Sequence, residues 1–175
     1  MKLSNETLNV LKNFASINSG IEFKTGNKLS TISSTKTVLA KATLKDEFPQ
    51  DFCIYDLNQF LSVHSLNKDT ELEFDPANVV FKSGRSKIKY RKTAKNMIVT
   101  APDKELVLPS VDASFTLKEE DLAQTLKTAS VLGSPNVAFE SDGSKVMVTT
   151  FNSKDDAAHT NSVRSEEHTS ELQSH

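Results

Sequence analysis

Cysteine and histidine offer this chain its clearest route to catalysis, but their sequence surroundings argue against it. The single cysteine, Cys53, lies within the apolar segment Phe52–Ile54, and no acidic residue stands at a spacing that would orient a catalytic pair. His64 follows Phe60 and Leu61 by about one helical turn. We therefore interpret Cys53 as a buried structural residue and His64 as a hydrogen-bonded histidine at the edge of the core.

Sequence motifs for metal, phosphate and covalent chemistry are missing from the chain. No Cys/His pairs have metal-ligand spacing, and there is neither a glycine-rich phosphate loop nor a nucleophile elbow. A lone cysteine cannot form an internal disulfide, which is compatible with a reducing cytoplasm. The sequence therefore predicts no enzyme, no metal site and no cofactor.

Amide and lysine side chains instead gather on the polar faces of predicted helices. The first helix places one set at i, i+4, i+7, i+8 and i+11, opposite its apolar face: Asn5, Asn9, Lys12, Asn13 and Ser16. A later helix has a comparable stripe of Gln124, Lys127 and Thr128, with its acidic residues confined to the first turn, where the helix dipole favours them. The recurrence favours a surface that faces a polyanion, and a simple solvated helix face is the alternative.

The densest cluster of positive charge lies between Lys82 and Lys95. On a strand, four of its cations would project to one face: Arg85, Lys87, Lys89 and Arg91. Ile88 and Tyr90 would project to the other face. A basic ribbon with an aromatic neighbour is typical of proteins that bind single-stranded nucleic acid. The interpretation that we favour is a soluble sheet face or a charged edge that discourages aggregation.

A helix followed by a two-stranded hairpin recurs three times and would position these side chains. The units begin at Ser4, Asp56 and near Lys118, although Thr116 and Glu119 have capping-box spacing. Each helix shows apolar residues at helical spacing: Leu8, Leu11, Phe14 and Ala15, then Leu57, Phe60 and Leu61, then Leu122, Leu126 and Ala129. Short helices and half-buried strands together predict an α+β fold with helices packed on one face of antiparallel sheets.

The hairpins are predicted from runs of β-forming residues separated by turn residues. Three turns are expected: Gly26-Asn27 after Ile21 and Phe23, residues 75–78 between 72–74 and 79–81, and Asp142-Gly143 between 137–139 and 146–148. Two prolines bracket a charged stretch within 101–110, which we interpret as a connector between domains. We expect a complete domain over 1–109 and about half of a second over 110–163, because the sequence becomes polar after Ser153.

The last stretch, Arg164 to His175, looks unlike the rest of the chain. Its sequence RSEEHTSELQSH matches the translation of an adapter oligonucleotide used in short-read sequencing, and a genuine disordered acidic tail is the alternative. The net charge of −2 arises in this tail, which carries one arginine and three glutamates. Residues 1–163 are then neutral. The whole chain, with 37% hydrophobic and 25% charged residues, reads as soluble and globular.

Several segments occur in an order and spacing that are specific as a set, although none is diagnostic alone. They are LSNETLNVLKNFASINSGI, IYDLNQFLSVHSL, GRSKIKY, APDKELVLPSV, and KEEDLAQTLK through VTTFN. Together they closely resemble the sliding clamps of T-even-type bacteriophages, from Met1 to about Val163. The resemblance implies a DNA polymerase processivity factor with the DNA-clamp fold: a homotrimeric ring of two-domain subunits, with helices lining a central hole and sheets outside.

The resemblance also implies which side chains face DNA. Lys12 and Lys127 match positions that face DNA in such clamps, and Lys68 is a weaker match. Asn9 and Asn13 share the stripe of Lys12. Asn5 and Ser130 stand where a member of the family has basic residues, so the inner surface is expected to be less positive than usual.

The resemblance implies four partners: double-stranded DNA, bound without regard to its sequence, the phage DNA polymerase, a clamp-loader ATPase and late-transcription proteins. It also implies a location in the cytoplasm of the bacterial host, away from membranes. Partner peptides are expected near the connector, at Leu106, Val107 and Leu108, which core packing would explain equally well.

The expected mechanism is retention by enclosure, with weak contacts to phosphates that allow sliding. Two alternatives remain open at this stage. A stand-alone single-strand or RNA binder would use residues 82–95 and bind linear oligonucleotides without a loader. A scaffold protein would keep the repeats and show no dependence on nucleic acid.

Overall fold

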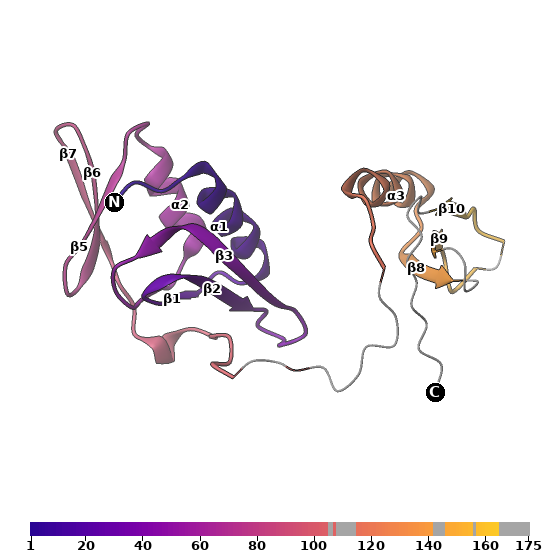
Figure 1. The fold of residues 1–175 in the computed structure, drawn as a ribbon, viewed down its shortest axis with the longest axis horizontal. Helices are drawn as coiled ribbons and strands as arrows, with labels where there is room; N and C mark the ends of the chain where they lie inside the picture. Colours follow the sequence, from indigo (N-terminus) through magenta and orange to yellow (C-terminus); the bar gives the residue numbers. More distant parts are fainter. Residues whose placement is uncertain (105–106, 108–114, 142–145, 156, 165–175) are drawn as a thin grey trace. The chain divides into compact units, whose positions relative to one another are not determined.

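The computed structural model describes residues 1–104, 107, 115–141, 146–155 and 157–164. The chain divides into two compact units, Met1–Glu105 and Leu106–His175, which Figure 1 draws as ribbons. The predicted boundary at residues 109 and 110 falls outside the described residues.

Two capped helices belong to the first unit. In α1 (Asn5–Ile17), the Ser4 hydroxyl accepts a hydrogen bond from the Thr7 backbone at 3.2 Å. In α2 (Leu57–Ser65), the Asp56 carboxylate accepts one from the Gln59 backbone at 2.9 Å. Both side chains satisfy an N–H group that the first helical turn would otherwise leave unpaired.

The apolar faces of both helices are buried as their spacing predicts. The fully or nearly fully buried side chains are Leu11, Phe14 and Ala15 of α1 and Leu57 and Phe60 of α2. Leu8 and Leu61 are partly buried and pack against the same core. The two helices pack against each other, and α1 also lies on β2 and β3, as Figure 1 shows.

Three small antiparallel sheets complete the first unit. The pairs and orders are β1 (Ile21–Phe23) with β4 (Phe52–Ile54), β2 (Gly26–Ile32) with β3 (Leu39–Phe48), and β5 (Glu71–Phe74), β6 (Asn78–Ser83), β7 (Ser86–Arg91). A short 3-10 helix, η1 (Lys95–Met97), follows, and Thr93 bridges back to Cys53.

The predicted turn at Gly26-Asn27 is wrong. Gly26 begins β2 and pairs with Phe48 of β3, and the register shifts between Gly26 and Lys28. Its φ of 101° belongs to the left-handed region that glycine adopts without strain. The glycine therefore redirects the chain into a bulged strand, and β1 pairs with β4 in place of β2.

The actual turn of the first hairpin joins β2 to β3 through residues 33–38. The Ser33 hydroxyl accepts hydrogen bonds from the backbones of Thr37 and Val38, both at 3.1 Å. The turn between β5 and β6 lies where the sequence predicts it. There the Asp75 carboxylate accepts hydrogen bonds from the backbones of Ala77 at 2.9 Å and Asn78 at 2.5 Å.

Aromatic rings make up the centre of the first unit. Phe23 of β1 stacks on Phe52 of β4 with ring centroids 4.6 Å apart and planes 12° from parallel. Phe60 of α2 lies 6.3 Å from Phe23 and 4.9 Å from Phe81 of β6. Phe60 therefore connects the sheet of β1 and β4 to the sheet of β6, and it fixes α2 against both.

The second unit contains one helix and three strands. They are α3 (Glu119–Leu132), β8 (Asn136–Ser141), β9 (Val146–Phe151) and β10 (Asn161–Arg164), with sheet order β10, β9, β8. Lys118 stands at the N-cap and makes no side-chain capping bond, and α3 packs on β9 and β10. The start near Lys118 is thus the correct one of the two alternatives.

The burial of α3 corrects the predicted apolar face. Thr125 is fully buried and Ala129 is 7% exposed, whereas Leu122 and Leu126 are 36% and 52% exposed. α3 packs on β9 and β10 of the described sheet, and its buried residues are Thr125 and Ala129. The two leucines lie outside this buried face.

Strand β10 was not predicted, because residues 153–163 are mostly polar. Its backbone pairs with β9 from Asn161 to Arg164, so it includes the first residue of the predicted tail. The rest of that tail, the turn at Asp142-Gly143 and half of the connector lie outside the described residues.

Removal of the Phe60 ring tests the role of the aromatic centre. Phe60 of α2 is 0% exposed and contacts rings from the three strands β1, β6 and β7. We expect Phe60→Ala to destabilise the first unit by about 3–5 kcal/mol, because large-to-small changes in a core leave a cavity. Urea unfolding of residues 1–109, followed by circular dichroism, measures the change. The control Tyr55→Ala alters a residue that is 62% exposed and should stay within about 0.5 kcal/mol. Equal losses in the two variants would contradict the assignment.

The carboxylate of Asp46 predicts a pH dependence of stability. Burial alone raises the pKa of Asp46, but hydrogen bonds from the Ser4 backbone and from the Thr7 and Ser4 hydroxyls, with the charge of Lys45, outweigh burial and lower it below its ordinary 3.8. A lowered folded-state pKa stabilises the fold above the unfolded value and loses this contribution as the pH falls through the folded value.

The stability difference between the native chain and Asp46→Asn should therefore be largest near neutral pH. It should shrink as the pH falls below about 4, where the carboxyl protonates in the unfolded chain. Urea unfolding across the pH range measures this difference. A constant difference between pH 7 and pH 2 would refute the assignment.

Candidate nucleic-acid interface

The polar face of α1 is exposed as its spacing predicts. Asn9, Lys12 and Asn13 lie at i, i+3 and i+4 and are all exposed. Asn5 and Ser16 extend the same face at its two ends, and the Ser16 hydroxyl donates a hydrogen bond to the Asn13 carbonyl at 2.6 Å. The structure thus brings together three of the five residues that were predicted to face DNA.

Helix α2 contributes a second polar face that sequence reasoning missed. Asn58, Ser62 and Ser65 are exposed, and the Ser62 hydroxyl donates to the Asn58 carbonyl at 2.8 Å. Their i, i+4, i+7 spacing is the signal that could have found them. Because α1 and α2 pack against each other, we call the exposed side chains of both helices the helix-pair surface.

Formal charge is scarce on the helix-pair surface. Within the two helices the charged residues are Glu6 and Lys12. Glu6 forms an ion pair with Lys45 at 3.5 Å, whereas Lys12 has no ion-pair partner among the described residues. Burial lowers the pKa of His64, so this imidazole is neutral at pH 7. One free ammonium group among amides and hydroxyls suits weak, sequence-independent contacts to phosphates.

The other predicted DNA-facing residues lie on separate elements. Lys68 is exposed in the turn between α2 and β5. The neighbouring Asp69 forms an ion pair with Lys2, with 3.7 Å between Oδ1 and Nζ. Lys127 is exposed on α3, in the second unit. Among the predicted partner-binding residues, Val107 is 80% exposed, and Leu106 and Leu108 lie outside the described residues.

The residues considered for catalysis occupy structural positions. Cys53 is buried, and burial followed by the charge of Glu22 raises the pKa of its thiol. His64 lies partly buried at the edge of the core as predicted, but its buried Nε2 has no hydrogen-bond partner among the described residues. The ring instead packs edge-on against Phe81, at 6.3 Å between centroids. No group of three potential metal ligands gathers among the described residues.

In the basic strand β7, cations on one face alternate with less exposed residues on the other, as the sequence predicts. Along β7 the cations are exposed, while Ile88 and Tyr90 are half-buried against the core. The Tyr90 hydroxyl donates to the Asp56 carbonyl at 3.0 Å and to the Gln59 side chain at 2.9 Å. The aromatic ring therefore faces α2 and is not available to stack on a base.

Comparison with known proteins decides the family. The model of the DNA polymerase processivity factor family matches residues 4–100, which include the helix pair and all strands of the first unit. The chain belongs to this family. Within the described residues, no helix is both long and apolar enough for a membrane span.

Its relatives are phage sliding clamps. The chain is 37% identical over 160 residues to the sliding clamp of Enterobacteria phage T4, covering 90% of this chain and 70% of that protein. It is 35% identical to that of Escherichia phage RB69, covering 90% and 69%. It is 33% identical to that of Vibrio phage KVP40, covering 85% and 69%. The predicted resemblance to T-even-type clamps is confirmed.

Solved structures show the fold. The DNA polymerase III beta chain of Streptococcus pneumoniae matches with a TM-score of 0.54 and 16% identity, covering 93% of this chain and 50% of that chain. Proliferating cellular nuclear antigen from Entamoeba histolytica matches with a TM-score of 0.53 and 16% identity, covering 94% and 75%. The predicted clamp fold is confirmed, and the chain spans half the length of the beta chain.

Substitution of the free lysine tests the helix-pair surface. Each lysine that neutralises a phosphate adds about 0.9 to the slope of log affinity against log salt. We expect Lys12→Ala to reduce this slope for duplex DNA by about one, equally for any sequence. Fluorescence anisotropy across salt concentrations measures the slope. The control Lys89→Ala removes a cation from the exposed face of β7 and should leave it unchanged. If the slope fell for Lys89→Ala and not for Lys12→Ala, the DNA contact would lie on the basic strand instead.

Proposed function

We propose that the chain is a subunit of a sliding clamp that encircles duplex DNA and tethers the replicative DNA polymerase of a T-even-type phage. The observation that carries this proposal is the sparse charge of the helix-pair surface, which has one free cation, in a chain that belongs to the processivity factor family. A protein that depended on adhesion would need several phosphate-neutralising cations, because affinity for DNA rises with their number. Enclosure removes that need.

The mechanism that we infer has two parts. A closed ring prevents escape, since a duplex without ends offers no exit. The helix-pair surface meanwhile makes few contacts, from groups that read phosphates and not base edges. Asn9, Lys12 and Asn13 would contact the backbone of the duplex, with Lys127 on α3 in the same role and Lys68 at the periphery. The role that we infer is binding, without a catalytic step.

Assembly and partners form the finer part of the proposal. We infer a homotrimer from the resemblance to T-even-type sliding clamps; the chain covers 70% of the T4 sliding clamp. A clamp-loader ATPase would close the ring, and late-transcription proteins would share it, in the cytoplasm of the bacterial host. The exposed Val107 supports a partner contact at Leu106, Val107 and Leu108.

The stand-alone single-strand binder has less support. Its basic strand has exposed cations, but Tyr90 is turned towards α2 and hydrogen-bonded there. Stacking of bases on aromatic rings contributes much of the affinity of such proteins. Without a stacking ring, residues 82–95 offer charge alone.

Retention on closed and open DNA tests enclosure. After a clamp loader has placed the assembled clamp on a nicked circular plasmid, we expect slow dissociation. Linearisation of the plasmid by a restriction enzyme should then release the protein within the dead time of the assay. Gel filtration of the DNA-bound fraction measures both. Blocking both linear ends with bulky adducts serves as the control and should restore retention. Equal loss from circular and linear DNA would refute enclosure.

A further inference from the structure

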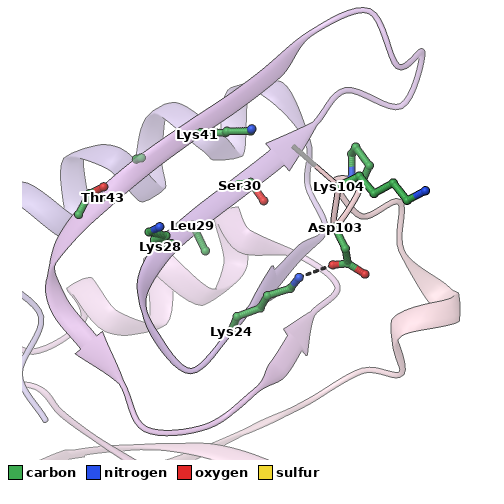
Figure 2. Close-up of a pocket in the computed structure, with 10 residues that line it drawn as sticks. Lys24, Lys28, Leu29, Ser30, Lys41, Thr43, Asp103 and Lys104 are labelled. Carbon is green, nitrogen blue, oxygen red and sulfur yellow. Dashed lines mark hydrogen bonds and ion pairs between the residues drawn. The ribbon is translucent and has the colours of Figure 1, made fainter. Parts of the chain in front are cut away.

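A cationic groove lies on the first unit, away from the helix-pair surface. We call it the connector groove. It has a volume of about 490 Å³, within the range of ligand sites. Its lining residues come from β2, β3 and the two loops beside them: Lys24, Lys28, Leu29, Ser30, Lys41, Ala42, Thr43, Pro102, Asp103 and Lys104. Figure 2 draws these residues as sticks and labels all of them except Ala42 and Pro102.

Strand alternation builds the floor of the connector groove. Leu29 and Thr31 of β2 are buried on the core side, so Lys28 and Ser30 point to the other side of the sheet. Register pairs Lys28 with Thr43 and Ser30 with Lys41 across the two strands. The floor therefore carries two ammonium groups and two hydroxyls, on the face that α1 does not cover.

The start of the connector forms the wall of the groove. The Asn18 side chain donates hydrogen bonds to the carbonyls of Ile32 and Val99, both at 2.9 Å, which fixes the segment that leads to the wall. Asp103 then forms an ion pair with Lys24 of the opposite side, drawn as a dashed line in Figure 2. Residues distant in sequence thus enclose one charged space.

The charges in this groove do not balance. Four lysines line it, with one carboxylate, Asp103. Lys28, Lys41 and Lys104 are exposed and have no ion-pair partner among the described residues. The hydrogen bond from Lys24, and the charges of Lys24 and Lys95, lower the pKa of Asp103. Asp103 thus shows the chemistry that the groove accepts, a carboxylate held by an ammonium group.

We propose that the connector groove binds an extended acidic segment of a partner protein, whose carboxylates pair with Lys28, Lys41 and Lys104. Lys28 and Lys41 are diagonal neighbours on adjacent strands, a relation that separates them by roughly 7–8 Å. Alternate side chains of an extended peptide are about 6.8 Å apart. The two spacings match, so acidic residues at every second position reach both lysines.

The lining chemistry favours a peptide over nucleic acid. The exposed Pro102 gives the groove an apolar wall that the side chains between the acidic residues can contact. None of its ten lining residues is aromatic, so bases would find no stacking platform. The proposal rests on the groove alone and does not require a ring around DNA.

Charge reversal of the floor tests the proposal with the 175-residue chain as it stands. The probe is a fluorescein-labelled peptide of alternating glutamate and leucine, titrated with protein at low salt and followed by anisotropy. We expect Lys28→Glu with Lys41→Glu to weaken binding at least about tenfold, because opposed carboxylates repel. The matched control, Lys87→Glu with Lys89→Glu, reverses two exposed cations of β7 and should leave binding within about twofold.

Two further measurements keep the outcome decisive. Asp103→Ala removes the internal carboxylate and frees Lys24, so it should tighten binding severalfold. A thymidine oligonucleotide of equal charge should bind less tightly than the peptide and be insensitive to Lys28→Glu with Lys41→Glu. Circular dichroism confirms that each variant is folded.

The proposal is overturned if the two double variants weaken the peptide equally, if Asp103→Ala weakens it, or if the oligonucleotide is the tighter ligand. Each of these results is independent of retention on circular DNA.

Discussion

The packing of Phe60 among aromatic rings from several strands is the interaction on which the first unit depends. From its place in α2, Phe60 meets rings of β1, β6 and β7. The three sheets of this unit are separate in their hydrogen bonding, so side-chain packing has to join them. Once α2 is fixed by Phe60, α1 packs beside it, and the polar sides of both helices form one surface.

Charge is distributed unevenly over this unit, and the distribution follows from its layers. The helix side carries amides, hydroxyls and one free lysine, whereas the sheet side carries the four lysines of the connector groove and the cations of β7. A nearly neutral chain therefore has two differently charged sides. The proposed loose hold on DNA and the proposed binding of an acidic partner would then use different sides of this unit.

Sequence periodicity predicted the features whose causes are local. The apolar faces of α1 and α2, the turn at Asp75 and the alternation along β7 follow from side chains within a few positions of each other. The pairing of β2 with β3 could not be read this way. The left-handed Gly26 looks like a hairpin turn in sequence, yet it serves as a bulge, because three-residue β1 finds its partner in β4.

Long-range placement explains the remaining misses. The connector groove joins residues near position 30 to residues near position 103, and no spacing rule links them. Strand β10 forms from polar residues that pair with β9 through their backbone, which hydrophobic patterning does not detect. The exposure of Leu122 and Leu126 depends on how much of α3 the sheet covers, a property of the assembled unit.

The sparse charge of the helix-pair surface has a consequence for motion. Translation by one base pair requires every phosphate contact to break and reform, so each added cation deepens the wells between successive positions. In the proposed clamp, a face with Lys12 as its free ammonium group would present a smooth energy profile along the duplex. Friction between subunit and DNA would then be low, and the machinery that the ring carries would set the speed of travel.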